Sequence, residues 1–377
     1  MRILFVTDTF VFGLGRTLFE TCKYLAKNGH EVKVLASSPD KNIPAKRLLD
    51  GVEMNQYYLK EPKYRPHSVM FLFKMLFNNC RLSGKIHKLS PLNCIILYQP
   101  LPVIGVKLNP FLLKVPKIYS FLCPWHKEYE LNVRLGEMNK INPKIWWYYI
   151  NSVARKLVEK ALKHGCKKVF VLTEYAKKEL LETHNVNTAL IEIIPGAIDT
   201  DKYKPIGAKD KLRLKLGMQK DNFILLTVRR LVPRMGLENL IMAMPTILKE
   251  NPSAYLVIAG DGPLREPLIA LTKSLGIETS VRLEGFVHMD KLPEYYSVAD
   301  LFILPTVALE GFGYVTIEAL SCGLPALGTD VGGTKEILNN FNPSLLFKGT
   351  APEDIASLIL QTGKKTQSEL EEIGRSG

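Results

Sequence analysis

Residues 300–323, DLFILPTVALEGFGYVTIEALSCG, combine an apolar strand, a loop and the start of a helix. The loop carries Glu310, and two glycines then lead into a helix that we expect to begin near Tyr314. A second carboxylate, Glu318, follows eight residues after the first, inside an apolar helical run. A carboxylate in such a run costs solvation free energy unless a partner holds it, so the pattern points to a binding site.

Strand-like and helix-like segments of this kind alternate along the whole chain. In the first half the strand-like segments are RILFVT (2–7), HEVKVLA (30–36), NCIILY (93–98), PKIYSF (116–121), KKVFVLT (167–173) and LIEIIP (190–195). After a lysine-rich connection the pattern restarts with FILLTV (223–228), AYLVIAG (254–260), VRLEGF (281–286), DLFILP (300–305), PALGT (325–329) and LLFK (345–348). This alternation predicts parallel sheets covered by helices. We therefore predict two Rossmann-like α/β domains, residues 1–196 and 197–377, with a hinge near residues 196–210.

Composition narrows the class of protein. The chain of 377 residues is long enough for two cores, and 46% hydrophobic and 23% charged residues are typical of a soluble globular protein. Six cysteines without a CxxC pair argue against a zinc site or a disulfide framework, so we expect reduced cytosolic thiols and no bound metal. The apolar segments are short or broken by prolines, so we expect no membrane-spanning helix.

Positive charge is concentrated in the first half of the chain. Residues 1–200 hold 30 Lys and Arg against 16 Asp and Glu, whereas residues 201–377 hold 20 against 21. An excess of this size indicates an anionic partner, such as a lipid surface or a phosphorylated substrate, or else a surplus of solubilising lysines.

Two loops at expected carboxyl ends of strands, where parallel sheets bind ligands, could hold an anion. VRRLVPRMG (228–236) places Arg229, Arg230 and Arg234 together, either to clamp a diphosphate or as a solvated cationic loop. DTFVFGLGRTLFE (8–20) offers Gly13 and Gly15 before a helix, either for an anion contact or for a tight turn. The second loop lacks the third glycine and the acidic residue of a dinucleotide site, so NAD binding is not expected.

The two glutamates suit a nucleotide sugar. Backbone amides of Gly311 to Gly313 lie at a positive helix end that favours a phosphate. Glu318, on the helix face shared with Tyr314 and Ser321, could accept hydrogen bonds from a vicinal diol such as a ribose. Glu310 could do the same for a sugar. The alternative is one helix-dipole partner and one surface glutamate.

Several of these motifs resemble the family 4 retaining glycosyltransferases of the GT-B fold. The resemblance runs through LAKNGHEVKVL, IPGAIDTDKYKP, RRLVPRMGLENL, LVIAGDGPLRE, LEGFV and EGFGYVTIEALSCGLPALGTDVGG, and its most specific part is the E-x7-E pattern of Glu310 and Glu318. It implies two Rossmann-like domains that face each other across a cleft, with residues 1–196 binding the acceptor and 197–377 the nucleotide-sugar donor.

The resemblance also implies roles for individual residues. Glu318 would bind the ribose and Glu310 the transferred sugar, while Gly311, Phe312, Gly313 and Tyr314 would line the donor site with their amides. Arg230 would bind the diphosphate, and Gly13 or Gly15 would belong to a loop that closes on the phosphates.

The chain departs from the family pattern at three places. Met235 stands where the family often has a lysine, and Arg234 is the expected substitute. Leu122 stands where the family has a histidine, so His126 is the nearest catalytic candidate, with a histidine satisfied in the core as the alternative. Phe12 replaces the first glycine of the N-terminal pair.

The function expected from this resemblance is retaining transfer of a hexose from a nucleotide-diphosphate sugar, UDP- or GDP-linked, to a lipid-linked or glycan acceptor. Arginines would take the place of a metal, and no other cofactor and no nucleic acid is expected. The alternatives are an inactive nucleotide-sugar-binding GT-B protein, a sugar-nucleotide epimerase and a glycan phosphorylase.

SVMFLFKMLFNNCRLSGKIHKLS (68–90) predicts a basic amphipathic helix. At 100° per residue, Lys74, Arg81, Lys85 and Lys88 share one sector, Leu72, Met75, Leu76, Leu82 and Ile86 fill the opposite side, and Phe71 and Phe77 flank the basic stripe. The helix either binds an anionic membrane or is a crossover helix packed on the sheet. Phosphatidylinositol mannosyltransferases of the same family use a basic helix at this place, which implies a cytoplasmic protein on the inner face of the membrane.

Overall fold

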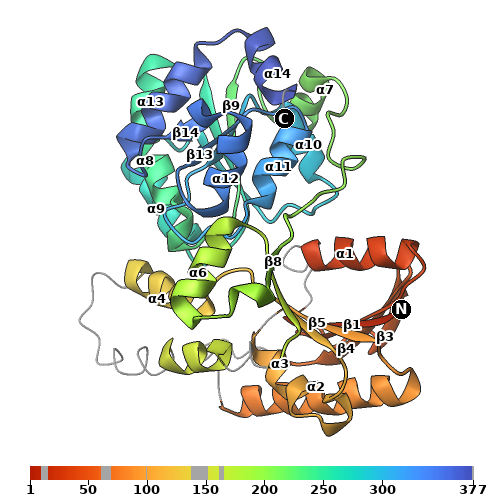
Figure 1. The fold of residues 1–377 in the computed structure, drawn as a ribbon. Helices are drawn as coiled ribbons and strands as arrows, with labels where there is room; N and C mark the ends of the chain where they lie inside the picture. The colour runs from red at the N-terminus through yellow and green to blue at the C-terminus, as the bar shows by residue number, and fades with distance from the viewer. Residues whose placement is uncertain (10–15, 61–68, 99, 137–151, 161–164, 376–377) are drawn as a thin grey trace. The chain divides into compact units, whose positions relative to one another are not determined.

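The computed structural model describes residues 1–377 except 10–15, 61–68, 99, 137–151, 161–164 and 376–377 (Figure 1). The chain divides into two compact units. Unit 1 comprises Met1–Glu130 and Asn142–Pro195, and unit 2 comprises Leu131–Ile141 and Gly196–Gly377. The chain thus passes into unit 2 between Pro195 and Gly196, whereas the sequence predicts a boundary between residues 196 and 197 and keeps Leu131 in the first domain.

Unit 1 is built on an eight-stranded sheet with the order β3-β4-β2-β1-β5-β6-β7-β8. Its strands are β1 Arg2–Thr9, β2 Glu31–Ser38, β3 Lys46–Leu49, β4 Val52–Tyr58, β5 Cys94–Leu97, β6 Lys117–Ser120, β7 Lys168–Val171 and β8 Ile191–Ile193. Every pair is parallel except β3 with β4. This is the parallel α/β architecture that the alternation predicts.

Helices cover both faces of this sheet, with α1 on one side and α2 and α3 on the other (Figure 1). The helices are α1 Arg16–Lys27, α2 Val69–Leu89, α3 Pro100–Lys107, α4 Trp125–Gly136, residues 152–160 and α6 Glu174–His184, with short 3-10 turns η1 Pro110–Leu112 and η2 Thr188–Leu190. Of α4, residues up to Glu130 belong to unit 1. Side chains alternate along β1, so that Ile3 and Phe5 pack with α1 while Leu4 and Val6 face the opposite core.

Unit 2 has a six-stranded, wholly parallel sheet with the order β11-β10-β9-β12-β13-β14. Its strands are β9 Phe223–Val228, β10 Ala254–Ala259, β11 Val281–Gly285, β12 Leu301–Leu304, β13 Ala326–Thr329 and β14 Leu346–Phe347. After β9 the chain moves to β10 on one side, and after β12 it moves to β13 on the other. The carboxyl ends of β9 and β12 therefore form the switch point at which such sheets bind ligands.

The helices of unit 2 also form two layers. They are α7 Lys209–Lys215, α8 Leu237–Glu250, α9 Arg265–Ser274, α10 Leu292–Val298, α11 Tyr314–Ser321, α12 Gly332–Phe341, α13 Pro352–Gly363 and α14 Gln367–Arg375, with 3-10 turns η3 Pro233–Met235 and η4 Pro343–Leu345. Residues of α8, α9 and α13 share one core with Leu225 and Ile303, whereas residues of α10, α11 and α12 share the other with Leu226 and Phe302. Figure 1 shows these two helix groups on opposite sides of the sheet.

A buried hydrogen-bond network in unit 1 joins α4, residues 152–160 and α6. Glu159 Oε1 accepts a hydrogen bond from the Trp125 N–H at the start of α4, 2.7 Å away. Its Oε2 lies 2.6 Å from Nδ1 of His126 and 3.5 Å from Nε2 of His184. All three titratable side chains are buried. His126 therefore matches the alternative of a histidine satisfied in the core.

The network keeps Glu159 ionised. Burial acts to raise the pKa of Glu159, but hydrogen bonds from His126, His184 and the Trp125 amide outweigh it and hold that pKa below its ordinary value. The N-terminal N–H groups of α4 further favour a negative charge at this place.

Replacing Glu159 by glutamine should lower the unfolding free energy at pH 7 by roughly 1.5 to 3 kcal/mol, because hydrogen bonds to a buried carboxylate are lost. The folded pKa of Glu159 lies below the ordinary 4.5, so its stabilisation is present above that value and disappears as the pH falls through the folded pKa. Urea unfolding of wild type and Glu159→Gln should therefore differ at pH 7 and converge at strongly acid pH.

The matched control is Glu182→Gln on α6, because Glu182 is exposed and lies 3.9 Å from Lys178. This exposed pair should contribute less than about 1 kcal/mol. Equal losses for the two variants at pH 7 would contradict the role assigned to the network.

Candidate functional site at the switch point of unit 2

Two loops meet at the switch point of unit 2, residues 229–236 after β9 and residues 305–313 after β12. Backbone contacts join them: the Val307 N–H donates to Arg234 O at 2.9 Å. Gly236 makes the approach possible, since a Cβ there would lie 1.8 Å from the carbonyl oxygen of Pro305, and its φ of +70° also favours glycine. Gly236 thus allows residues 229–236 to pack closely against residues 305–313.

Glu310 lies at this junction and is held by Arg229. Nη2 of Arg229 donates to Glu310 Oε2 at 2.6 Å, and the Thr306 hydroxyl donates to the same oxygen at 3.1 Å. The two charged side chains are 5% and 12% exposed. Burial acts to raise the pKa of Glu310, but the charge and hydrogen bond of Arg229, the charge of Arg234 and the Thr306 hydroxyl together hold that pKa below its ordinary value. Glu310 is therefore an anion anchored at one oxygen.

The three arginines after β9 have different surroundings. Arg229 is ion-paired as described, and the buried Arg234 donates from Nη1 to the carbonyl oxygen of Leu309 at 2.9 Å. Arg230 is exposed, and no hydrogen bond or ion pair joins its side chain to the part of the chain that the structure describes. In this structure Arg229 and Arg234 contact the loop that carries Glu310, and the diphosphate clamp of three arginines stays a prediction.

Helix α11 begins at Tyr314, as the sequence predicts, and the backbone before it is closely packed. Gly313 has φ +93° at the N-cap. The N–H of Gly333, in the first turn of α12, donates to Glu310 O at 2.8 Å, and a Cβ on Gly333 would lie 2.5 Å from the Cα of Phe312. Gly332 and Gly333, at the start of α12, thus pack closely against the chain just before α11 and help to fix it.

Glu318 is fully buried, with an exposed fraction of 0%. The Tyr296 hydroxyl of α10 donates to its Oε2 at 2.7 Å. The sequence places Glu318 on a helix face with Tyr314 and Ser321, and that face is buried in this structure, so the ribose contact stays a prediction. The connection after β8 covers that face: the Ser321 hydroxyl donates to Tyr203 O, and a Cβ on Gly196 would lie 2.6 Å from the Tyr314 hydroxyl.

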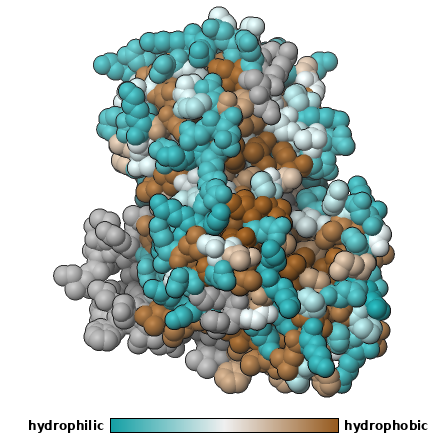
Figure 2. Space-filling model, viewed as in Figure 1, coloured by the Kyte–Doolittle hydropathy of each residue, from teal (hydrophilic) through white to brown (hydrophobic). Residues whose placement is uncertain are grey.

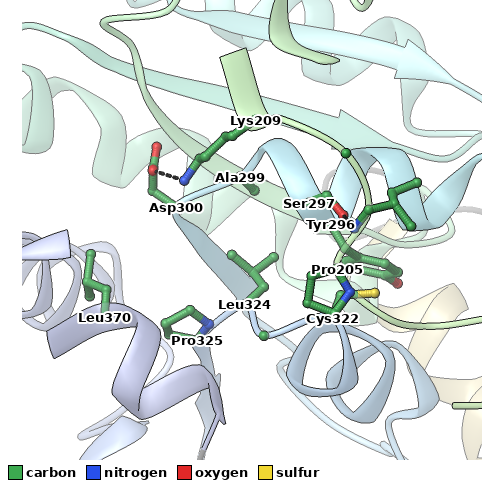
Figure 3. Close-up of a pocket in the computed structure, with 13 residues that line it drawn as sticks. Pro205, Lys209, Tyr296, Ser297, Ala299, Asp300, Cys322, Leu324, Pro325 and Leu370 are labelled. Atoms are coloured by element: carbon green, nitrogen blue, oxygen red, sulfur yellow. Dashed lines mark hydrogen bonds and ion pairs between the residues drawn. The ribbon is translucent and has the colours of Figure 1, made fainter. Parts of the chain in front are cut away.

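A cavity of about 220 Å³ lies at the opposite, amino-terminal edge of the same sheet (Figure 3). Pro325 and Asp300, which line it, directly precede β13 and β12. Asp300 pairs there with Lys209 at 2.6 Å, as Figure 3 shows. Tyr296 lines this cavity and also donates a hydrogen bond to Glu318.

The remaining sequence-based candidates lie elsewhere. Gly13, Gly15 and Phe12 are outside the described residues. His126, Glu159 and His184 bring three metal-ligating atoms within 4.8 Å of one another, a cluster that the sequence analysis missed because its members are far apart in the chain. Its spacing of 2.6 Å between His126 and Glu159 is that of a hydrogen bond, and the Trp125 amide occupies the other carboxylate oxygen. Among the described residues this donor set therefore forms a hydrogen-bond network.

Comparison with known proteins gives the family. The Glycosyltransferase Family 4 model matches residues 11–202, more than half of the 377 residues, and the model of glycosyl transferases group 1 matches residues 208–376. An uncharacterized glycosyltransferase of Methanocaldococcus jannaschii is 28% identical over 94% of this chain and 87% of its own length. A GDP-mannose-dependent alpha-(1-6)-phosphatidylinositol monomannoside mannosyltransferase of Mycobacterium tuberculosis is 31% identical over 46% of this chain and 46% of its own length.

Solved structures agree with the fold. The sucrose-phosphate synthase of Thermosynechococcus elongatus has a TM-score of 0.80 at 19% identity, covering 100% of this chain and 92% of its own. WaaG, a glycosyltransferase involved in lipopolysaccharide biosynthesis, has a TM-score of 0.73 at 18% identity, covering 100% and 94%. The chain has the GT-B fold and belongs to glycosyltransferase family 4.

Proposed function

We propose that this protein is a retaining hexosyltransferase that binds a nucleotide-diphosphate sugar at the switch point of unit 2. The observation that carries the proposal is the anchored, ionised Glu310 beside the first turn of α11 and the exposed Arg230. Arg230 and the amides from Gly311 to Tyr314 would meet the diphosphate, and Glu310 would accept hydrogen bonds from the sugar. In the expected front-face mechanism, the leaving diphosphate takes the acceptor proton while these groups stabilise its charge.

Names of relatives and neighbours support a UDP- or GDP-linked donor. The mycobacterial relative is named as GDP-mannose-dependent, and an Anabaena neighbour, HepE, was solved with UDP and glucose. This chain spans about half the length of the mycobacterial mannosyltransferases that it matches. Donor and acceptor therefore belong to the proposal, with a lipid-linked or glycan acceptor expected.

Ribose binding by Glu318 requires a local opening. Its carboxylate is sealed, so a ribose reaches it only when the covering segment that includes Gly196 and Tyr203 moves away from α11. We give His126 no part in the proposed chemistry, because it is buried and hydrogen-bonded to Glu159.

Glu318→Gln should weaken binding of the nucleotide diphosphate by roughly 1.5 to 3 kcal/mol, because a hydrogen bond to a charged group is lost. A thermal-shift panel of UDP, GDP and ADP sugars first identifies the nucleotide that stabilises the wild type, since binding to the folded state raises its stability by mass action. Titration calorimetry with that nucleotide diphosphate then compares the variant with Glu250→Gln, an exposed glutamate at the end of α8. Unchanged affinity in Glu318→Gln would remove the ribose contact from the proposal.

Transfer should not require a divalent metal, because Arg230 and backbone amides at a helix N-terminus are placed to neutralise the diphosphate. Donor hydrolysis should therefore keep its rate in excess EDTA. Loss of activity that manganese or magnesium restores would show that protein groups alone do not hold the diphosphate.

Donor binding without any hydrolysis or transfer would favour the alternative of an inactive nucleotide-sugar-binding protein, which Met235 in place of a lysine permits.

The outward face of α2 supports a membrane-surface acceptor. Lys74, Arg81, Lys85 and Lys88 are exposed, while Met75 and Ile86 are buried, as the helical wheel predicts. The helix packs on α3 through its buried side, so it is a crossover helix with an unusual outer face. Phe71 and Leu72, also named in the prediction, lie outside the described side chains.

Aromatic side chains accompany the basic stripe. Phe73 and Phe77 are 71% and 65% exposed, and Lys88 lies over the ring of exposed Phe111 in η1 at 4.2 Å. Figure 2 shows hydrophobic and hydrophilic side chains side by side over the end of unit 1 that carries α2. Such a mixture favours the interface of an anionic bilayer, consistent with a protein on the cytoplasmic face. No described helix is both long and apolar enough to cross a membrane.

The protein should cosediment with phosphatidylglycerol-containing liposomes at low salt, and added salt should weaken this. Changing Lys74, Arg81, Lys85 and Lys88 to glutamine should abolish binding, since each basic residue near such a surface contributes about 1 kcal/mol. The matched control changes four exposed lysines elsewhere in unit 1, Lys156, Lys160, Lys167 and Lys178. Failure of the wild type to bind, or equal loss in both variants, would contradict the role of α2.

A further inference from the structure

We propose that Arg229 is a positioning residue for Glu310, fixing one oxygen of its carboxylate so that the other can receive a hydroxyl group of the donor sugar. The proposal rests on the proposed function, because it assigns Glu310 to the sugar. It gives Arg229 a different role from the next residue, Arg230, which we assign to binding the diphosphate.

A single nitrogen makes the contacts of Arg229 within this loop pair. Its Nη2 lies 2.6 Å from Glu310 Oε2, 2.6 Å from Thr306 Oγ1 and 2.6 Å from Met235 Sδ. Thr306 is fully buried, and the Arg229 side chain is 5% exposed. The charged end of Arg229 is thus enclosed by protein groups, which leaves it poorly placed to bind a diphosphate.

The two oxygens of Glu310 differ in the same way. Oε2 accepts from both Arg229 and Thr306, whereas within the described chain no group donates to Oε1. The side chain keeps 12% exposure. The backbone is fixed as well, because Gly333 N–H binds the carbonyl oxygen of Glu310. A carboxylate held at one oxygen and at its main chain presents its second oxygen in one direction, which is the preorganisation that sugar binding needs.

Two positive groups face Glu310, Arg229 from the loop after β9 and Arg234 from η3. Helix α12 packs against the same loop through Gly332 and Gly333, which carry no charge. Burial would by itself raise the pKa of Glu310, and Arg229 makes the largest opposing contribution. Removing the charge of Arg229 should therefore move protonation of Glu310 toward neutral pH.

The test uses the full chain and the nucleotide sugar that stabilises the wild type most in the thermal-shift panel. Donor hydrolysis is measured from pH 4 to 9 for wild type, Arg229→Gln, Arg229→Lys and Arg230→Gln, with the dissociation constant of the matching nucleotide diphosphate. In Arg229→Gln the acid limb of the kcat profile should move up by about one pH unit, and kcat at pH 7 should fall roughly 10-fold or more, as for loss of a charged positioning group. Nucleotide diphosphate affinity should stay within about 3-fold, because Arg229 makes no contact that a diphosphate would replace.

The other variants separate charge from shape. Arg229→Lys should return the acid limb to its wild-type position, since one nitrogen carries the contacts and a lysine Nζ keeps the charge. Arg230→Gln should weaken nucleotide diphosphate binding about 10-fold or more without moving the acid limb. A merely structural role would lower the melting temperature of Arg229→Gln and leave its acid limb in place. Should Arg229→Gln not fold, Arg229→Met is measured in its place, and its acid limb should also move up because methionine carries no charge.

Two results would overturn the role of Arg229 alone: an acid limb that does not follow the charge at position 229, or an affinity loss in Arg229→Gln equal to that in Arg230→Gln. If the wild type binds none of the nucleotide sugars, the proposed function fails and this role fails with it.

Discussion

The ion pair between Arg229 and Glu310 joins two loops of unit 2. One follows β9 and leads toward β10, and the other follows the neighbouring strand β12 and leads toward β13. Arg229 directly follows β9, and Glu310 lies in the loop after β12, 81 residues further along the chain. Each group removes the cost of burying the other, since an unpaired charge at this depth would be strongly unfavourable. The pairing joins the two loops that carry the groups we assign to the donor.

Other contacts reinforce the same junction. Arg234 binds the carbonyl oxygen of Leu309, and Gly236 lets the backbone of one loop lie against Pro305 of the other. Gly332 and Gly333 of α12 pack against the residues that precede α11. The result is a rigid edge with an anionic oxygen and an exposed arginine, which is the combination that a sugar diphosphate needs. Glu318, which accepts a hydrogen bond from Tyr296, belongs to the interior in this structure.

Local sequence patterns were sufficient for much of this account. Apolar runs of four to eight residues ended at turn signals, so most strands and the alternation with helices were predicted, and the glycines before Tyr314 marked the start of α11. The outer face of α2 also followed from its helical period, because one side of a crossover helix must pack on the sheet.

What could not be predicted depends on which distant segments become neighbours. The sequence places Arg229, Arg230 and Arg234 on one loop but does not say that Glu310 lies opposite Arg229, because this requires β9 to pair with β12. The burial of Glu318 depends on Tyr296 and on the chain that crosses α11. The core role of His126 depends on Glu159, 33 residues away. Spacing within a motif carries no information about such partners.

The most direct measurement is a crystal structure of the protein with the nucleotide diphosphate that stabilises it most. The account predicts the diphosphate at the carboxyl ends of β9 and β12, within hydrogen-bond distance of Arg230 and of amides between Gly311 and Tyr314, with the Arg229–Glu310 pair intact. A nucleotide bound at the amino-terminal edge, in the cavity beside Lys209 and Asp300, or a diphosphate that breaks the Arg229–Glu310 pair, would contradict it.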